Sequence, residues 1–169
     1  DIELTDQVLT PLNTRPTLRL PYPMQIGSGS YDLKGGLTWR GGREKVGYGA
    51  QWRSTLRLVD NDEDYRLGVE HQLTGWVSYS PQPALSFSAR LAYLDRGQID
   101  GIDPQIVAPV QTANPDFQGF SRLDLSVGMN WLIPGGHQGH RVAAEIGAPV
   151  WQDLNGPQLE TDLMLTVGY

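Results

Sequence analysis

The stretch DLMLTVGY, residues 162–169, decides the fold class, because its apolar and polar residues alternate without a break. Leu163, Leu165, Val167 and Tyr169 fall on one face of an extended strand, and the residues between them fall on the other face. A chain that stops on an aromatic residue after such a strand is typical of outer-membrane β-barrels, whose strands turn one face to lipid and the other to a polar lumen.

Six earlier segments repeat this alternation, and each is long enough to cross a bilayer, which takes about 9–11 residues. They cover residues 31–40, 45–59, 65–79, 85–94, 122–133 and 141–150. The sequence therefore predicts an all-β fold, an antiparallel up-and-down transmembrane β-barrel with about seven strands in residues 31–169. Residues 1–30 contain four prolines and are predicted to be an extended segment on the loop side of the barrel.

Composition agrees with this interpretation and narrows the function. The chain is 39 % hydrophobic with a mean hydropathy of -0.36, and no run approaches the ~20 apolar residues of a spanning helix. A barrel strand is compatible with these averages, because every second residue can be polar. The net charge of -6 and the lack of a basic patch argue against nucleic acid as a partner. Without cysteine there is no disulfide and no thiolate metal site.

The connections between the predicted strands differ at the two ends of the barrel. Compact turns rich in Gly or Pro cover residues 41–44, 81–84 and 134–139, and they alternate with longer or acidic connections at 60–64, 97–121 and 151–158. Outer-membrane barrels have short periplasmic turns and longer outside loops. This parity predicts a location in the bacterial outer membrane, with membrane lipid as a partner and the last residue on the side of the short turns.

Aromatic residues near the strand ends predict two girdles at the membrane interfaces. Trp39, Tyr48, Tyr79, Phe87, Trp131 and Tyr169 fall near the short-turn ends, while Tyr31, Tyr65 and Tyr93 fall near the loop ends.

Charged residues of the strands fall almost entirely on the opposite face from the apolar residues. This segregation predicts a charged lumen, because a Lys or Arg on a lipid face near the midplane costs about 2–4 kcal/mol. The alternative is the solvated face of a soluble sheet, since alternation alone does not distinguish lipid from a protein core. The residues predicted to line the lumen are Arg53, Arg57, Arg66, Glu70, Arg90, Arg122, Asp124, Glu145 and Asp162.

Seven strands are an odd number, whereas single-chain bacterial barrels have even numbers. The chain is therefore predicted to be part of a larger barrel, completed either by further N-terminal strands of a longer polypeptide or by other copies of the chain.

Four segments carry a resemblance to a known family: LPYPMQIGSGSYDL (20–33), GYGAQWRSTLRLVDNDEDYRLG (47–68), GIDPQIVAPVQTANPDFQG (101–119) and GHRVAAEIGAPVWQDLNGPQLETD (139–162). They resemble the C-terminal half of the MetA-pathway-of-phenol-degradation family of bacterial outer-membrane transporters. The resemblance covers nearly the whole chain and implies location, fold and a longer polypeptide. It supplies no catalytic or binding residue.

Residues for chemistry are sparse, and no enzyme activity, metal or cofactor is predicted. His137 and His140 share a Gly-rich turn, and the acidic loop Asp60–Asp64 lacks the spacing of a Ca²⁺ loop such as the EF-hand. A remote alternative is a lipid-facing hydrolase, because a four-residue loop would place His71 opposite Ser54 on the apolar face. No acidic or amide side chain is evident on that face to orient the base.

The function predicted from these features is a channel or transporter for a small solute, with hydrophobic and aromatic compounds among the candidates, and the solute is selected by the bore and the lining charge. The main alternative is a structural or partner-binding barrel that does not transport, with its lumen plugged by Arg–carboxylate pairs.

Overall fold

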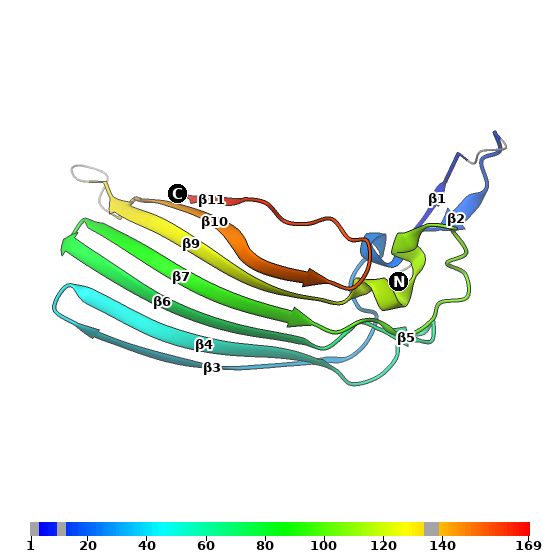
Figure 1. Ribbon diagram of the computed structural model, residues 1–169, viewed down its shortest axis with the longest axis horizontal. Coiled ribbons are helices and arrows are strands. Elements are labelled where there is room, and N and C mark those ends of the chain that lie inside the picture. The colour runs from blue at the N-terminus through cyan, green and yellow to red at the C-terminus, as the bar shows by residue number, and fades with distance from the viewer. Residues whose placement is uncertain (1–3, 10–12, 134–138) are drawn as a thin grey trace.

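The computed structural model describes residues 4–9, 13–133 and 139–169, and its dominant feature is one antiparallel sheet of seven long strands. The strand order is β11-β10-β9-β7-β6-β4-β3, so each long strand pairs with the next long strand along the chain (Figure 1). The predicted all-β class and the seven antiparallel strands are confirmed. The strands are β3 (Asp32–Arg43), β4 (Val46–Arg57), β6 (Glu70–Gln82), β7 (Leu85–Arg96), β9 (Phe120–Leu132), β10 (Arg141–Leu154) and β11 (Met164–Gly168).

This sheet is open. Strands β3 and β11 form its two edges, and they do not pair with each other or with another strand among the described residues. In Figure 1 the two edge strands lie on opposite sides of the sheet.

The short elements gather beyond one end of the sheet, which we call the loop end (Figure 1). Strands β1 and β2 pair with each other, as do β5 and β8. The described part of residues 1–30 therefore contains a short antiparallel strand pair and a helical turn, and it is not simply extended. No helix in the described part of the chain has the length and apolar character to cross a membrane. The short elements are β1 (Thr5–Gln7), β2 (Thr17–Arg19), η1 (Tyr22–Met24), β5 (Tyr65–Arg66), β8 (Asp100–Gly101), η2 (Gln111–Ala113) and η3 (Pro115–Gln118).

The other end of the sheet, which we call the turn end, carries the compact connections. Two residues, Glu44 and Lys45, link β3 to β4, and Glu44 adopts a left-handed φ of 54° to make this tight turn. Tyr169 also lies here, because its hydroxyl hydrogen-bonds the His140 Nδ1 just before β10. The long connections 58–69, 97–119 and 155–163 lie at the loop end, so the described short connections and the long connections fall at opposite ends of the sheet, as their parity predicts. Residues 134–138 of the predicted turn 134–139 lie outside the described residues.

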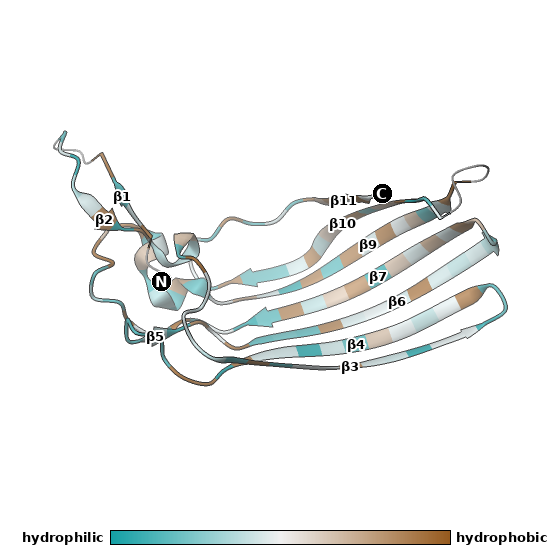
Figure 2. Cartoon of the chain, turned by 180° about the vertical axis from the view of Figure 1, so that it is seen from behind, coloured by the Kyte–Doolittle hydropathy of each residue, from teal (hydrophilic) through white to brown (hydrophobic). Residues whose placement is uncertain are grey.

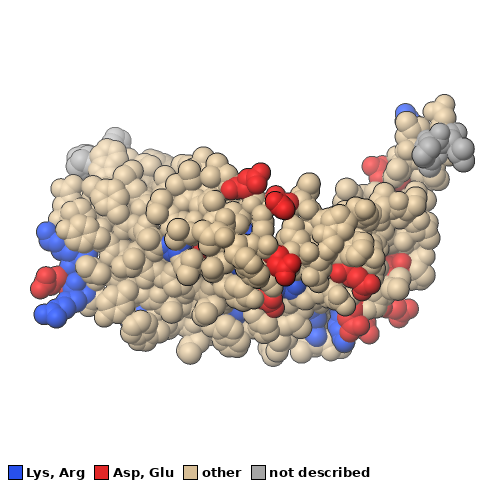
Figure 3. Space-filling model, in the orientation of Figure 1, with Lys and Arg blue, Asp and Glu red and all other residues tan. Residues whose placement is uncertain are grey.

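The pairing register separates the residues into two faces. Leu73 of β6 pairs with Trp52 on one side and Tyr93 on the other, and Leu91 pairs with Leu125. These residues belong to the apolar face, whose large side chains are exposed along every strand. Hydrophobic and hydrophilic bands alternate along the strands in Figure 2. On the face seen in Figure 3, Lys and Arg gather at the turn end, while Asp and Glu are spread over the half toward the loop end.

The opposite face, which we call the charged face, carries charged residues set among small ones. Gly49 allows the Trp76 indole to lie directly over its backbone, since a Cβ at Gly49 would come within 2.3 Å of the ring. A Cβ at Gly147 would meet the Ser126 hydroxyl at the same distance. Glycine at these positions lets neighbouring side chains of the charged face pack close to the backbone.

Strand β10 contains one irregularity. Pro149 pairs with Asp124 and Trp151 pairs with Leu123, so Val150 is an extra residue without a partner in the ladder. This β-bulge shifts the phase of the alternation by one residue, and β10 continues to Leu154 where its sequence pattern predicts an end at Val150.

A small hydrophobic core, which we call the loop core, lies beyond the sheet. Tyr22, Tyr65 and Ile99 are buried in it, and the rings of Tyr22 and Tyr65 meet edge to face with centroids 5.0 Å apart. Leu67 packs against this cluster. The loop core ties the segment before β3 to the long connections after β4 and β7.

Candidate functional site

Ion pairs organise the charged face. Each of its four carboxylates forms an ion pair with one arginine, and three of the four pairs join different strands. The pair Arg90–Glu145 reaches from β7 to β10, across β9. Arg96 Nη2 lies 2.7 Å from Glu70 Oε2, and Arg122 Nε lies 3.0 Å from Asp124 Oδ1. The fourth pair is Arg57–Asp32, between β4 and β3.

Four more cations lie on this face, and they form no ion pair with any described residue. Their places in the register put them on the charged face, and all four side chains are exposed. The charged face of the sheet therefore has eight cations against four carboxylates, an excess of four positive charges in a chain whose net charge is -6. These additional cations are Lys34, Arg40, Arg53 and Arg141.

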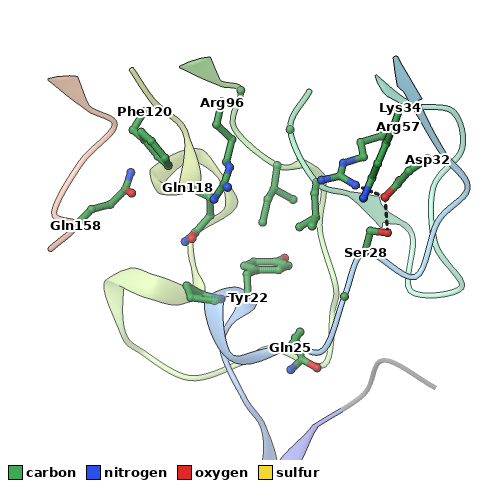
Figure 4. Close-up of a pocket in the computed structure, with 16 residues that line it drawn as sticks. Tyr22, Gln25, Ser28, Asp32, Lys34, Arg57, Arg96, Gln118, Phe120 and Gln158 are labelled. Carbon is green, nitrogen blue, oxygen red and sulfur yellow. Dashed lines mark hydrogen bonds and ion pairs between the residues drawn. The ribbon is translucent and has the colours of Figure 1, made fainter. Parts of the chain in front are cut away.

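A cavity of about 620 Å³ lies at the loop end, between the charged face of the sheet and the segment before β3. Figure 4 shows Lys34 and Arg57 on one flank, Arg96 and Phe120 on the other, and Tyr22 between them. The sheet thus supplies the cations of the cavity, while the N-terminal segment and the loops supply a ring and polar side chains. Gln25, Gln118 and Gln158 add amide groups to the lining.

The cavity lining has more cations than carboxylates. Asp32 is the carboxylate in its lining, and this carboxylate is already bonded by Arg57 and by the hydroxyls of Ser28 and Ser30, at 3.0 Å each. Across the cavity, the guanidinium of Arg96 lies 5.1 Å from the centre of the Phe120 ring. An aromatic face beside a cation fits the cation–π arrangement and holds the arginine in place.

A buried ion cluster fastens the N-terminal segment at the loop end. Arg19 Nη1 lies 2.7 Å from Asp103 Oδ2 and 2.6 Å from Glu63 Oε2, and the Arg19 and Asp103 side chains are 5 % and 2 % exposed. Burial alone would lower the pKa of Arg19, but the hydrogen bonds and charges of Asp103 and Glu63 raise it overall. The Asp103 backbone N–H also donates to the Tyr22 hydroxyl at 3.0 Å, which links the cluster to the loop core.

Burial raises the pKa of both tyrosines of the loop core. For Tyr22 this effect outweighs the hydrogen bond from the Asp103 backbone. For Tyr65, burial is likewise the largest cause. Both phenols are therefore held in the neutral form up to a higher pH than in water.

Most residues predicted to line the lumen lie on the charged face, with two exceptions. Arg66 belongs to β5 at the loop end, where it pairs with Asp100 and lies 3.5 Å from Asp60. Asp162 precedes β11 in the connection 155–163 and is exposed. The structure places these two residues outside the long strands in which the sequence predicts them, because the third and seventh long strands begin later in the chain than the alternation suggests. Those on the charged face are Arg53, Arg57, Glu70, Arg90, Arg122, Asp124 and Glu145.

The aromatic residues predicted for the girdles are exposed, except Tyr65. Tyr65 is 1 % exposed in the loop core, so its assignment to the loop-side girdle is wrong. Trp151, which the sequence did not single out, stacks near Tyr93 at the loop end with ring centroids 6.5 Å apart. At the other end Trp39 packs against Tyr48, with centroids 5.5 Å apart.

The Ser–His juxtaposition on the apolar face is present, but it is not assembled as a catalytic pair. Ser54 pairs with His71 in the ladder, as predicted. Asp95 lies opposite His71 on the next strand, so the expectation that this face has no acidic side chain beside the histidine is wrong. The Ser54 hydroxyl has no hydrogen-bond partner among the described residues, and the His71 ring stacks on Trp52. Asp95 accepts its hydrogen bond from Ser121. This geometry gives the serine no bonded base.

No group of three or more His, Asp or Glu residues suited to a metal ion occurs in the described ranges. Of the histidine pair considered for a metal, His140 contacts Tyr169, and His137 lies outside the described residues.

Comparisons with models of known protein families, with curated proteins and with solved structures give no match to this chain.

Proposed function

We propose that this sheet is part of the wall of a β-barrel in the bacterial outer membrane, and that the barrel is a channel for a small solute. The observation that carries the proposal is the exposed apolar face, which extends over all seven long strands. A contiguous apolar surface of this size marks contact with a membrane or another protein. The family resemblance of four sequence segments points to the same location.

The height of the apolar face favours lipid as the partner. On β4 the apolar residues run from Val46 to Leu56, and on β9 from Leu123 to Trp131. With about 3.3 Å per residue and a strand tilt of about 40°, these segments have heights of roughly 25 Å and 20 Å along the membrane normal. The apolar band of outer-membrane barrels is about 25 Å tall.

The open edges favour a larger barrel. Each unpaired N–H and C=O group costs several kcal/mol in hydrocarbon, so β3 and β11 require further strands inside a bilayer. Further strands of a longer polypeptide, as the family resemblance suggests, or other copies of this chain would supply them. About eight strands leave an interior filled by side chains, whereas more strands leave room for a channel.

Conductance in planar lipid bilayers tests the channel. The purified protein should open steps of conductance, and Arg53→Glu should change the ratio of anion to cation permeability, because Arg53 is exposed on the charged face. Arg43→Glu, at the turn end and outside the charged face, is the matched control.

A second candidate function is a structural or partner-binding barrel that does not conduct. The observation in its favour is the set of four Arg–carboxylate pairs on the charged face, together with the N-terminal segment fastened at the loop end. Correctly folded protein that gives no conductance would support this candidate and contradict the channel.

A further inference from the structure

We propose that the cavity at the loop end binds a small organic anion, a carboxylate carried on an apolar body. This inference rests on the proposed function, since it names the class of solute that the channel would select.

The charged residues of the cavity favour an anion. Three cations line the cavity, Lys34, Arg57 and Arg96, and one carboxylate, Asp32. Arg57 pairs with Asp32 inside the cavity, and Arg96 pairs with Glu70 of the neighbouring strand. Lys34 has no ion pair with a described residue, and it is an exposed residue in the cavity lining. A carboxylate solute can therefore pair with Lys34 without breaking an existing ion pair.

The bonding of Asp32 argues against a cationic solute. One oxygen of this carboxylate takes a hydrogen bond from Ser28 at 3.0 Å and the ion pair with Arg57, and the other takes a hydrogen bond from Ser30. An amine or a metal ion would have to displace these bonds. The same network keeps the Asp32 charge neutralised, so it repels an anion weakly.

Apolar side chains supply the rest of the site. Leu67, Ile99 and Phe120 line the cavity together with the ring of Tyr22. A volume of about 620 Å³ is typical of sites for small organic molecules, which range over roughly 300–1,000 Å³. The amide nitrogens of the three glutamines in the lining donate to backbone carbonyl groups and so hold the chain segments around the cavity in place. A purely inorganic anion would leave the apolar surface in contact with water, so the lining favours an organic one.

The charged face beyond the cavity also favours an anion. Arg53 lies diagonally across from Lys34, because Gly36 pairs with Arg53 and Lys34 with Thr55. Arg40 and Arg141 lie toward the turn end. Cations without an ion pair among the described residues thus extend from the cavity to the far end of the sheet, which provides a route for an anion once it leaves the site.

Two probes of the same shape test the site: benzoate, which is charged, and benzamide, which is not. Binding to the full chain in detergent is measured by isothermal titration calorimetry. We expect benzoate to bind at least about tenfold more tightly than benzamide, because a hydrogen bond to a charged group is stronger than one to a neutral group. Lys34→Gln should remove most of this preference and Lys34→Arg should retain it. Arg43→Gln, a turn-end variant, is the control and should bind like the wild type.

The outcomes separate this inference from the channel itself. Equal binding of the two probes, no binding of either, or unchanged benzoate binding in Lys34→Gln would overturn the anion site even if the protein conducts. Benzoate binding that depends on Lys34 in a protein without conductance would support the site and contradict the channel. Lys34 has an exposed side chain with no ion pair in the described chain, so its variants should fold, and heat-modified mobility on gels verifies this.

Discussion

Replacing Val127 by arginine measures directly whether the apolar face meets lipid. Val127 is 53 % exposed on β9, and it lies halfway along the apolar segment from Leu123 to Trp131. It lies four positions from either end, which corresponds to about 10 Å of height at a strand tilt of about 40°. An arginine there would lie near the midplane of the bilayer.

We expect Val127→Arg to lower the free energy of unfolding by about 2–4 kcal/mol, and Trp131→Arg, near the interface, to lose no more than about 1 kcal/mol through its added charge. Leu125→Arg, two residues from Val127, should fall between them. The decline with depth is the signature of a bilayer, because a protein partner over this face would give no such gradient.

The assay is equilibrium urea unfolding from lipid vesicles, followed by tryptophan fluorescence. Gln51→Arg is the matched control on the charged face, since it adds the same side chain and loses only an exposed hydrogen bond to Thr38. Its cost should stay within about 0.5 kcal/mol. Equal costs for Val127→Arg and Gln51→Arg would refute the reasoning, as would a monodisperse protein in water without detergent.

Three further predictions concern the loop end and the sheet edges. Arg19→Met leaves the Asp103 carboxylate buried without its cation, so it should destabilise the loop end by about 3–5 kcal/mol and speed hydrogen exchange in residues 13–30, while exchange in β7 and β9 stays slow; unchanged exchange would contradict this. Because burial raises the pKa of Tyr22 and Tyr65, the unfolded state loses its phenol protons first. Loop-core stability should therefore be complete below about pH 10 and fall above it, which protease cleavage rates from about pH 9 to pH 11 would show; a flat rate would contradict it. Native mass spectrometry in detergent should give a particle larger than one copy of this chain, either several copies or a longer polypeptide, and a lone 169-residue species would rule out both ways of pairing β3 and β11.

The long strands and their two faces are predictable from sequence because both depend on a local pattern with a period of two residues. The predicted strand boundaries are wrong where the alternation continues beyond the residues that pair in the sheet. Tyr65, Leu67 and Val69 alternate as a strand would, yet β6 begins at Glu70. At Gly68 the backbone approaches Gly97 so closely that a Cβ would lie 1.8 Å from the Gly97 carbonyl oxygen. Contacts of this kind join distant parts of the chain and leave no local pattern.

The cavity and the ion pairs are hard to predict for the same reason. Arg90 and Glu145 are 55 residues apart and meet across an intervening strand, so their pairing depends on the register of three strands. The buried cluster of Arg19 and Asp103 joins residues 84 apart. A signal was available for Lys34, which lies on the polar side of its strand, but only the register shows that its neighbours leave it without an ion pair among the described residues.

The bulge in β10 makes the chain unequally sensitive to changes in length. Removing Val150 would bring Trp151 next to Pro149 and regularise the ladder, so every side chain of β10 would keep its face. Removing a residue between Arg141 and Ala148 would instead shift the register of one part of the strand by one residue, so the side chains of that part would move to the opposite face. Such a shift can exchange Glu145 and Ile146 between the two faces. Natural or engineered variants should therefore tolerate the loss of Val150 better than a deletion between Arg141 and Ala148.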